Sequence, residues 1–99
     1  MKIAFVVHTD VYAPRVAEIL QQAGIDYFTR WHQVEGKGHK TEPHLGTRSF
    51  PELNSVLMIA FEEDEKLETL VAKIGKANAE IVRIDDRIRL FQVPLERIV

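Results

Sequence analysis

The sequence predicts a small α+β domain in which two strand–helix–strand halves build one four-stranded antiparallel sheet. Four short segments are rich in β-branched and aromatic residues, and two others carry apolar residues at helical spacing. A chain of 99 residues has the usual length of one domain, so residues 1–99 are expected to fold as a single unit. Residues 36–52 follow neither period and are expected to form a long loop.

The first half of the chain predicts a strand, a helix and a strand. Residues 2–8, KIAFVVH, form an apolar run typical of a buried strand. Asp10 is placed to cap a helix that accommodates Pro14 in its first turn and ends near Gly24. The apolar face of this helix is expected to consist of Ala13, Val16, Ala17 and Leu20. Residues 25–34 then predict a second strand, because they are rich in β-branched and aromatic types.

The second half repeats this order. Residues 55–63 are apolar on both faces at their centre, which indicates a central strand. Asp64 is placed to cap the second helix. The apolar face of that helix is expected to consist of Leu67, Leu70, Val71 and Ile74. Asp85 and Asp86 predict a turn, and residues 87–93 predict the fourth strand.

The resulting order, β-α-β-β-α-β, is that of the ferredoxin-like fold, here with a long loop between the second and third strands. Both helices are expected on one face of the sheet, which leaves the other face to be covered. The predicted strands carry the aromatic residues Phe5, Phe28, Trp31, Phe61 and Phe91. Aromatic side chains on an open sheet face favour a protein partner over water, and a second copy of the chain is the preferred candidate.

Composition narrows the classes of function. The net charge is −2, and without a basic excess a nucleic-acid partner is not expected. The chain has no cysteine, which excludes disulfides and thiolate metal sites. The apolar run at the N-terminus is too short for a membrane span and lacks a cleavage site. We therefore expect a cytoplasmic protein without direct membrane insertion.

The central third of the chain carries a specific pattern. A tryptophan in the second predicted strand is followed by a V-x-G-[KR]-G turn and then by G-T-x-[FW]-P-E-[LM]-N-S. The matching residues are Trp31, Val34, Gly36, Lys37, Gly38, Gly46, Thr47, Phe50, Pro51, Glu52, Leu53, Asn54 and Ser55. This unit resembles the short PII-like proteins, relatives of the PII nitrogen-regulatory proteins. The resemblance implies a homotrimer with the sheets facing inward, and a T-loop that contacts target proteins. It also implies a cleft between subunits that binds effectors, usually adenine nucleotides.

The resemblance and the residues together predict where an effector binds. Gly36 and Gly38 let backbone amides approach an anion, while Lys37 and Lys40 add positive charge. Alignment of the fourth strand places Arg87 at the phosphate-binding lysine of PII proteins, and Arg89 shares its strand face. The expected effector-binding residues are Gly36, Lys37, Gly38, His39, Lys40, Arg87 and Arg89. A solvated edge face is the competing interpretation of the arginines.

Two departures from PII proteins bear on this prediction. Classical PII proteins use a C-terminal pair of arginines near the nucleotide, whereas this chain has only Arg97 there. The loop contains no tyrosine, so uridylylation has no acceptor. We expect a signalling protein without catalytic activity that binds a small anionic effector, for which an adenine nucleotide is one candidate. Its loop, mobile from about Gly36 to Arg48 without ligand because apolar anchors are lacking, would regulate a transporter or an enzyme.

Two alternatives remain open. His39 and His44 could bind a divalent metal in a CutA-like trimer, since imidazole is the commonest metal ligand in proteins. Solvated loop histidines are the simpler interpretation of that pair. A small enzyme of ferredoxin-like fold is the other alternative, although no nucleophile–base or carboxylate pair stands in a recognisable setting.

Overall fold

The computed structural model describes residues 1–39, 42–49 and 52–99. It confirms the predicted α+β class and the order of elements. The strands are β1 (Lys2–Thr9), β2 (Thr29–Val34), β3 (Asn54–Phe61) and β4 (Arg89–Pro94). The helices are α1 (Ala13–Gln22) and α2 (Asp64–Glu80), with two short 3-10 helices, η1 (Asp10–Tyr12) and η2 (Ile84–Asp86).

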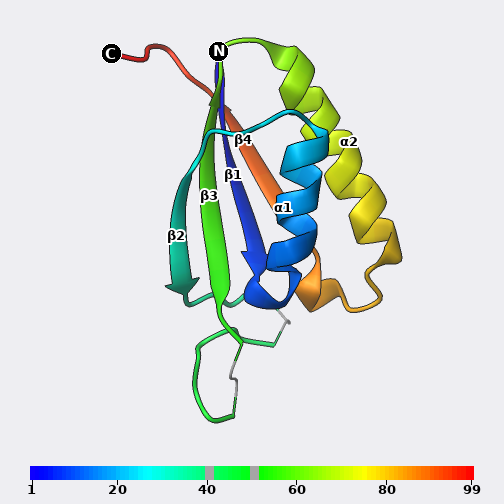
Figure 1. Ribbon diagram of the computed structural model, residues 1–99. Coiled ribbons are helices and arrows are strands. Elements are labelled where there is room, and N and C mark those ends of the chain that lie inside the picture. The colour runs from blue at the N-terminus through cyan, green and yellow to red at the C-terminus, as the bar shows by residue number, and fades with distance from the viewer. Residues whose placement is uncertain (40–41, 50–51) are drawn as a thin grey trace.

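The four strands form one antiparallel sheet in the order β2-β3-β1-β4, with α1 and α2 on one face (Figure 1). Because neighbouring strands are antiparallel, the ends of β1 and β2 and the starts of β3 and β4 meet at the same end of the sheet. The long loop between β2 and β3 extends from this end, and η2 lies beside it (Figure 1). The topology therefore brings together the segments that the sequence marks as functional.

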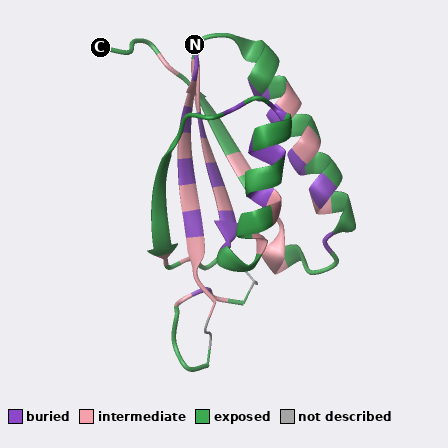
Figure 2. Ribbon diagram, in the orientation of Figure 1, coloured by how far each residue is buried: buried purple, intermediate pink, exposed green. Residues whose placement is uncertain are grey.

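The core lies between the sheet and the helices. Along β3, burial alternates strictly, as the bands of Figure 2 show, and Ser55, Leu57, Ile59 and Phe61 face the helices. The buried apolar residues of this core are Ala4, Val6, Val16, Ile19, Leu20, Ala23, Ile25, Leu57, Ile59, Phe61, Leu67, Leu70, Ile74, Ala77, Ile81 and Ile88. Most residues of the predicted apolar helix faces are buried: Val16, Leu20, Leu67, Leu70 and Ile74. Ala13 and Ala17 are exposed, and Val71 is 39% exposed.

Both predicted helix caps are wrong. Asp10 begins η1, and α1 starts after Tyr12 without a side-chain cap. Asp64 is the first residue of α2, and its carboxylate accepts a hydrogen bond from Lys2 at 2.7 Å instead of capping the helix. The Asp10 carboxylate likewise accepts a hydrogen bond from Ser55 Oγ at 2.7 Å. The two carboxylates that were expected to cap helices therefore accept hydrogen bonds from residues distant in the sequence.

Two strand boundaries also differ from the prediction. The second strand begins at Thr29, because Ile25 is used to end α1: its amide donates to the carbonyl of Leu20 and its side chain enters the core. The fourth strand begins at Arg89, and the predicted turn at Asp85 and Asp86 belongs to η2.

No helix formed by the described residues lies on the second face of the sheet (Figure 1). Phe5 of β1 pairs with Met58 on one side and Phe91 on the other, and Trp31 pairs with Val56, so these side chains share this face. Trp31 is 46% exposed and Phe91 is 57% exposed. Within the described ranges, no helix combines the length and apolar character needed to cross a bilayer.

Candidate functional site

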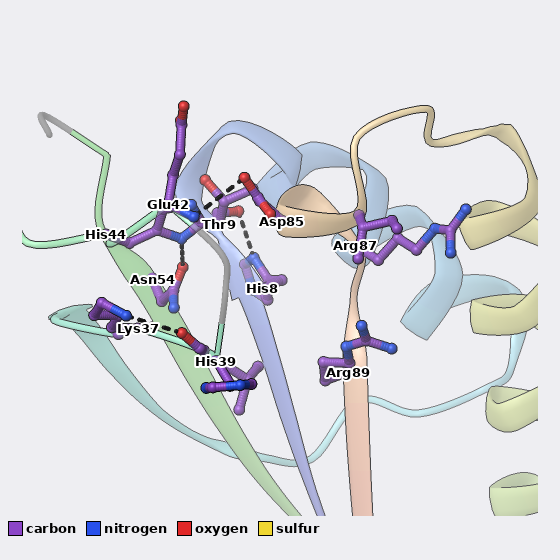
Figure 3. Close-up of a pocket in the computed structure, with 14 residues that line it drawn as sticks. His8, Thr9, Lys37, His39, Glu42, His44, Asn54, Asp85, Arg87 and Arg89 are labelled. Atoms are coloured by element: carbon purple, nitrogen blue, oxygen red, sulfur yellow. Dashed lines mark hydrogen bonds between the residues drawn. The ribbon is translucent and has the colours of Figure 1, made fainter.

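A cavity of about 290 Å³ lies at the end of the sheet where the long loop leaves it. Its walls come from the end of β1, the base of the loop, the start of β3, η2 and the start of β4. The lining residues are Val7, His8, Thr9, Gly36, Lys37, Gly38, His39, Glu42, His44, Asn54, Ile84, Asp85, Arg87 and Arg89. Figure 3 shows the loop-base side chains on one side of His8 and the two arginines on the other.

Six of the seven predicted effector-binding residues line this cavity, and Lys40 lies outside the described residues. The six are Gly36, Lys37, Gly38, His39, Arg87 and Arg89. They come from segments about fifty residues apart in the chain, and the return of β4 to the edge of β1 brings them together. Both members of the predicted metal pair, His39 and His44, also line the cavity.

The base of the loop is structured. Gly36 and His44 exchange two backbone hydrogen bonds, of 2.7 and 2.6 Å, across an isolated antiparallel bridge. His44 is only 7% exposed, and its Nδ1 lies 2.6 Å from Oδ1 of Asn54. The segment from Gly36 to Arg48 is expected to be mobile because it lacks apolar anchors, and the structure adds a polar anchor at His44. The anchor is a buried imidazole with a fixed hydrogen-bond partner, which a search for apolar residues does not detect.

The arginine side of the cavity is positioned by Asn78 of α2. The Asn78 side chain accepts a hydrogen bond from the amide of Ile88 at 2.8 Å and donates one to the Ile88 carbonyl at 2.7 Å. Ile88 is 1% exposed and lies between Arg87 and Arg89. This pair of bonds fixes the backbone from which both arginines project. Asn78 was not identified from the sequence, because its role depends on a backbone that lies ten residues away.

We expect Asn78→Ala to lower the free energy of unfolding by about 1–3 kcal/mol, because two buried backbone groups lose their partners. Chemical denaturation measures this loss. The free energy of unfolding of Asn78→Asp should lie between those of wild type and Asn78→Ala, since the aspartate keeps the acceptor for the Ile88 amide and loses the donor. Equal stability of Asn78→Ala and wild type would show that these bonds do not hold the start of β4.

His8 lies at the centre of the cavity wall and is 2% exposed. Its Nδ1 lies 2.8 Å from the carbonyl oxygen of Thr9, which can only accept, so Nδ1 carries the proton. Burial is the main cause that lowers the pKa of His8 below its ordinary value of 6.5. The neutral ring then presents Nε2 as an acceptor, and among the described residues this atom has no hydrogen-bond partner. The same holds for Oγ1 of Thr9 and Nε of Arg87.

The lowered pKa of His8 predicts a dependence of stability on pH. Below its ordinary pKa of 6.5, the unfolded chain binds a proton at His8 that the folded chain resists, so stability is full above pH 6.5 and falls as the pH decreases. One such proton contributes at most about 1.4 kcal/mol per pH unit. Denaturation of His8→Gln between pH 7 and 5 should show a smaller loss than wild type. The exposed control His39→Gln should follow wild type, and parallel losses in all three proteins would refute the assignment.

The cavity also has an acidic edge. The amide of Glu42 donates a hydrogen bond to Oδ2 of Asp85 at 3.3 Å, which ties the loop to η2. Arg83 contacts the Glu42 carboxylate at 2.6 Å and that of Asp85 at 3.5 Å. The site therefore combines the cations Lys37, Arg87 and Arg89 with acceptors on the η2 side. This arrangement is suited to a ligand that has both anionic and donor groups.

A second cavity, of about 680 Å³, lies on the helix side of the molecule and is a weaker candidate for an anion. Its lining residues are Gln22, Ala23, Tyr27, Ala60, Glu62, Glu63, Glu65, Lys66, Thr69 and Ile98. Three carboxylates face it against a single lysine, and the amine of Lys66 already donates to the carbonyl of Gly24 at 2.9 Å. The larger space thus has the wrong charge for the predicted effector.

Ser55, Asp10 and His32 lie together at the start of β3. The Ser55 hydroxyl donates a hydrogen bond to Oδ1 of Asp10 at 2.7 Å. Nδ1 of His32 lies 3.4 Å from the hydroxyl oxygen of Ser55. Ser55 is 2% exposed, and its proton is directed at the carboxylate and not at the imidazole. These residues therefore do not form the nucleophile–base pair that a serine hydrolase needs.

Comparison with known proteins bears on the fold. No protein-family model and no curated protein sequence matches the chain. Among solved structures, the chain is similar to CPII, a nitrogen regulatory PII-like protein from Thiomonas intermedia K12. One CPII structure gives a TM-score of 0.69 at 13% identity, over 97% of this chain and 88% of that chain. A second gives 0.68 at 14% identity with the same coverage. This chain has the PII-like fold.

The predicted resemblance is thus confirmed at the level of the fold. The first of the two CPII structures is bound to ADP, AMP and bicarbonate, and the second to ADP and bicarbonate. The polar cavity residues to which the sequence analysis gave no effector- or metal-binding role are His8, Thr9, Glu42, Asn54 and Asp85. Polar residues at the ends of neighbouring strands are the signal that could have identified His8, Thr9 and Asn54.

Proposed function

We propose that the chain is a PII-like regulatory protein that binds a small anionic effector, with an adenine nucleotide as the leading candidate. The observation that carries the proposal is the cavity that gathers Lys37 from the loop, Arg87 from the end of η2 and Arg89 from the start of β4. Phosphate groups bind well to arginine, whose planar guanidinium presents several donors in a fixed geometry. Gly36 and Gly38 allow close approach of the ligand to the loop backbone.

The uncharged and acidic groups of the cavity favour a nucleotide over a bare phosphate. Nε2 of His8 is an acceptor without a partner among the described residues, and Oδ2 of Asp85 accepts a hydrogen bond from the amide of Glu42. Ribose hydroxyls and the adenine amino group supply matching donors. The two CPII structures with adenine nucleotides and bicarbonate support this choice, and bicarbonate is the second anion to test.

The size of the cavity supports a site that is shared between chains. Pockets for drug-sized ligands span about 300–1,000 Å³, and the cavity of about 290 Å³ in one chain lies at the lower end of that range. The exposed aromatic face with Trp31 and Phe91 is suited to packing against further copies of the chain. In the proposed homotrimer these faces meet inward, and a neighbouring subunit completes the effector cleft.

The loop is the proposed output of the protein. Its base is held by the Gly36–His44 bridge and by the contact between Glu42 and Asp85, both at the cavity. An effector that contacts these residues changes the arrangement of the loop, and a transporter or an enzyme recognises that arrangement. The protein itself carries out no chemical step in this proposal.

Calorimetric titration of the purified protein with ADP, AMP, ATP and cyclic AMP, each with and without bicarbonate, tests the proposal. We expect at least one of the nucleotides to bind with a dissociation constant below 1 mM. Inorganic phosphate serves as the control and should bind more weakly than the best nucleotide. If none of the nucleotides binds at millimolar concentration, the nucleotide proposal fails.

A further inference from the structure

A second group of side chains lies beside the cavity, where the loop base meets η2. His44 comes from the loop, Glu52 from the segment just before β3, and Asp86 from η2. Nε2 of His44 lies 3.4 Å from Oε2 of Glu52 and 4.0 Å from Oδ1 of Asp86. One ligand atom from each residue lies within 4.8 Å of the other two, and no other group of this kind occurs in ranges 1–39, 42–49 and 52–99.

The hydrogen bonding of His44 leaves this group incomplete. The amide oxygen of Asn54 can only accept, so Nδ1 of His44 donates to it and Nε2 faces the two carboxylates. The His44 side chain is 9% exposed. Within the described part of the chain, neither Nε2 of His44 nor Oδ1 of Asp86 has a hydrogen-bond partner. A buried lone pair that faces carboxylate oxygens requires a positive charge between them, supplied by a proton or by a cation.

We propose that His44, Glu52 and Asp86 bind a divalent transition-metal ion of the Zn²⁺ class. In a tetrahedral site with bonds of about 2.0–2.2 Å, neighbouring ligand atoms lie about 3.4 Å apart. The separation of His44 from Glu52 already has this value, whereas Oδ1 of Asp86, 4.0 Å from His44, must move closer to complete the site. One imidazole with two carboxylates favours Zn²⁺ over Mg²⁺ and leaves a fourth position for water.

Residues around the group hold the ligands in place. Asn54 fixes the tautomer and orientation of the His44 ring. Nε of Arg83 lies 3.8 Å from Oδ2 of Asp86, so the arginine occupies one carboxylate oxygen and leaves Oδ1 for the metal. The positive charge of Arg83 reduces the attraction for a cation, although it is shared with Glu42 and Asp85.

The site differs from the metal pair that the sequence predicts. His39 is exposed and does not belong to the group, so His44 acts with two carboxylates and not with a second histidine. The metal links the loop base, the start of β3 and η2. It needs no nucleotide, so this inference does not depend on the proposed effector.

Titration of the nucleotide-free protein with Zn²⁺, in competition with a chromophoric chelator, tests the site. We expect one Zn²⁺ per chain in wild type and no competition from Mg²⁺. Glu52→Gln and Asp86→Asn keep the shape of the side chains and remove the charge, and each should weaken Zn²⁺ binding at least tenfold. His39→Ala and the remote carboxylate control Asp26→Asn should bind as wild type does.

The ring nitrogens of His44 provide a second readout in the wild-type protein. Zn²⁺ should shift the ¹⁵N resonance of Nε2 and leave Nδ1 hydrogen-bonded. The inference is overturned if wild type does not bind Zn²⁺ at micromolar concentration, which would show that a proton alone completes the group. It is also overturned if binding is lost in His39→Ala, or if both isosteric carboxylate variants retain full affinity.

Discussion

Replacing Trp31 and Phe91 together with glutamate should leave the chain folded and convert the proposed trimer into monomers. Both side chains lie on the open face of the sheet, at 46% and 57% exposure in the isolated chain. On an isolated chain the carboxylates would be solvated at little cost. Inside an assembly, each unpaired carboxylate would cost several kcal/mol because of lost hydration. Light scattering coupled to size-exclusion chromatography measures the change in mass.

The matched control is Val82→Glu, because Val82 is 92% exposed and lies after α2, away from the sheet face. It should keep the mass of wild type. Circular dichroism establishes that the double variant is folded. An unchanged mass in the double variant would mean that the aromatic face is not the interface, and a monomeric wild type would refute the proposed trimer itself.

Arg87→Ala should weaken binding of the effector nucleotide by about 1.5–3 kcal/mol, the range for a hydrogen bond to a charged group. This corresponds to a roughly 10- to 150-fold higher dissociation constant. Arg87 is chosen because it lines the cavity and its Nε has no hydrogen-bond partner within the described residues. Calorimetry with ADP measures the difference. Arg87→Lys should bind nearly as weakly if the contact to phosphate is bidentate, since lysine cannot reproduce the planar fork.

Arg15→Ala is the control for this series, because Arg15 pairs with Glu80 at 3.1 Å on the helix side and does not line the cavity. It should bind ADP as wild type does. If Arg87→Ala and wild type bind equally well, the phosphate lies elsewhere, whether or not the chain regulates a partner.

The sequence predicted the parts of the fold that depend on periodic burial. Leu67, Leu70 and Ile74 recur at helical spacing in the sequence, and all three are buried in α2. It failed where a side chain has a partner far along the chain. Asp10 and Asp64 were predicted to cap helices, but their carboxylates accept hydrogen bonds from Ser55 and Lys2. Predictions from neighbouring residues cannot identify those partners, because they lie far away in the sequence.

The candidate site was predicted in the same uneven way. The glycines and cations of the loop and of β4 were found because they match a sequence pattern, and the fold brings them to one cavity. His8 was noted only as the end of a strand, since its burial and its bond to Thr9 follow from the packed structure. The role of His44 depends on Asn54, Glu52 and Asp86, whose positions are set by three different elements.

Following the backbone amides by NMR while ADP is added locates the bound nucleotide directly. Binding at the proposed site should shift the amides of Thr9, Gly36, Gly38 and Arg89, which surround the cavity at the loop base. The amide of Thr69, at the acidic second cavity, should stay unchanged. Shifts at Thr69 without shifts at the loop base would show that ADP binds at the second cavity and not at the proposed site.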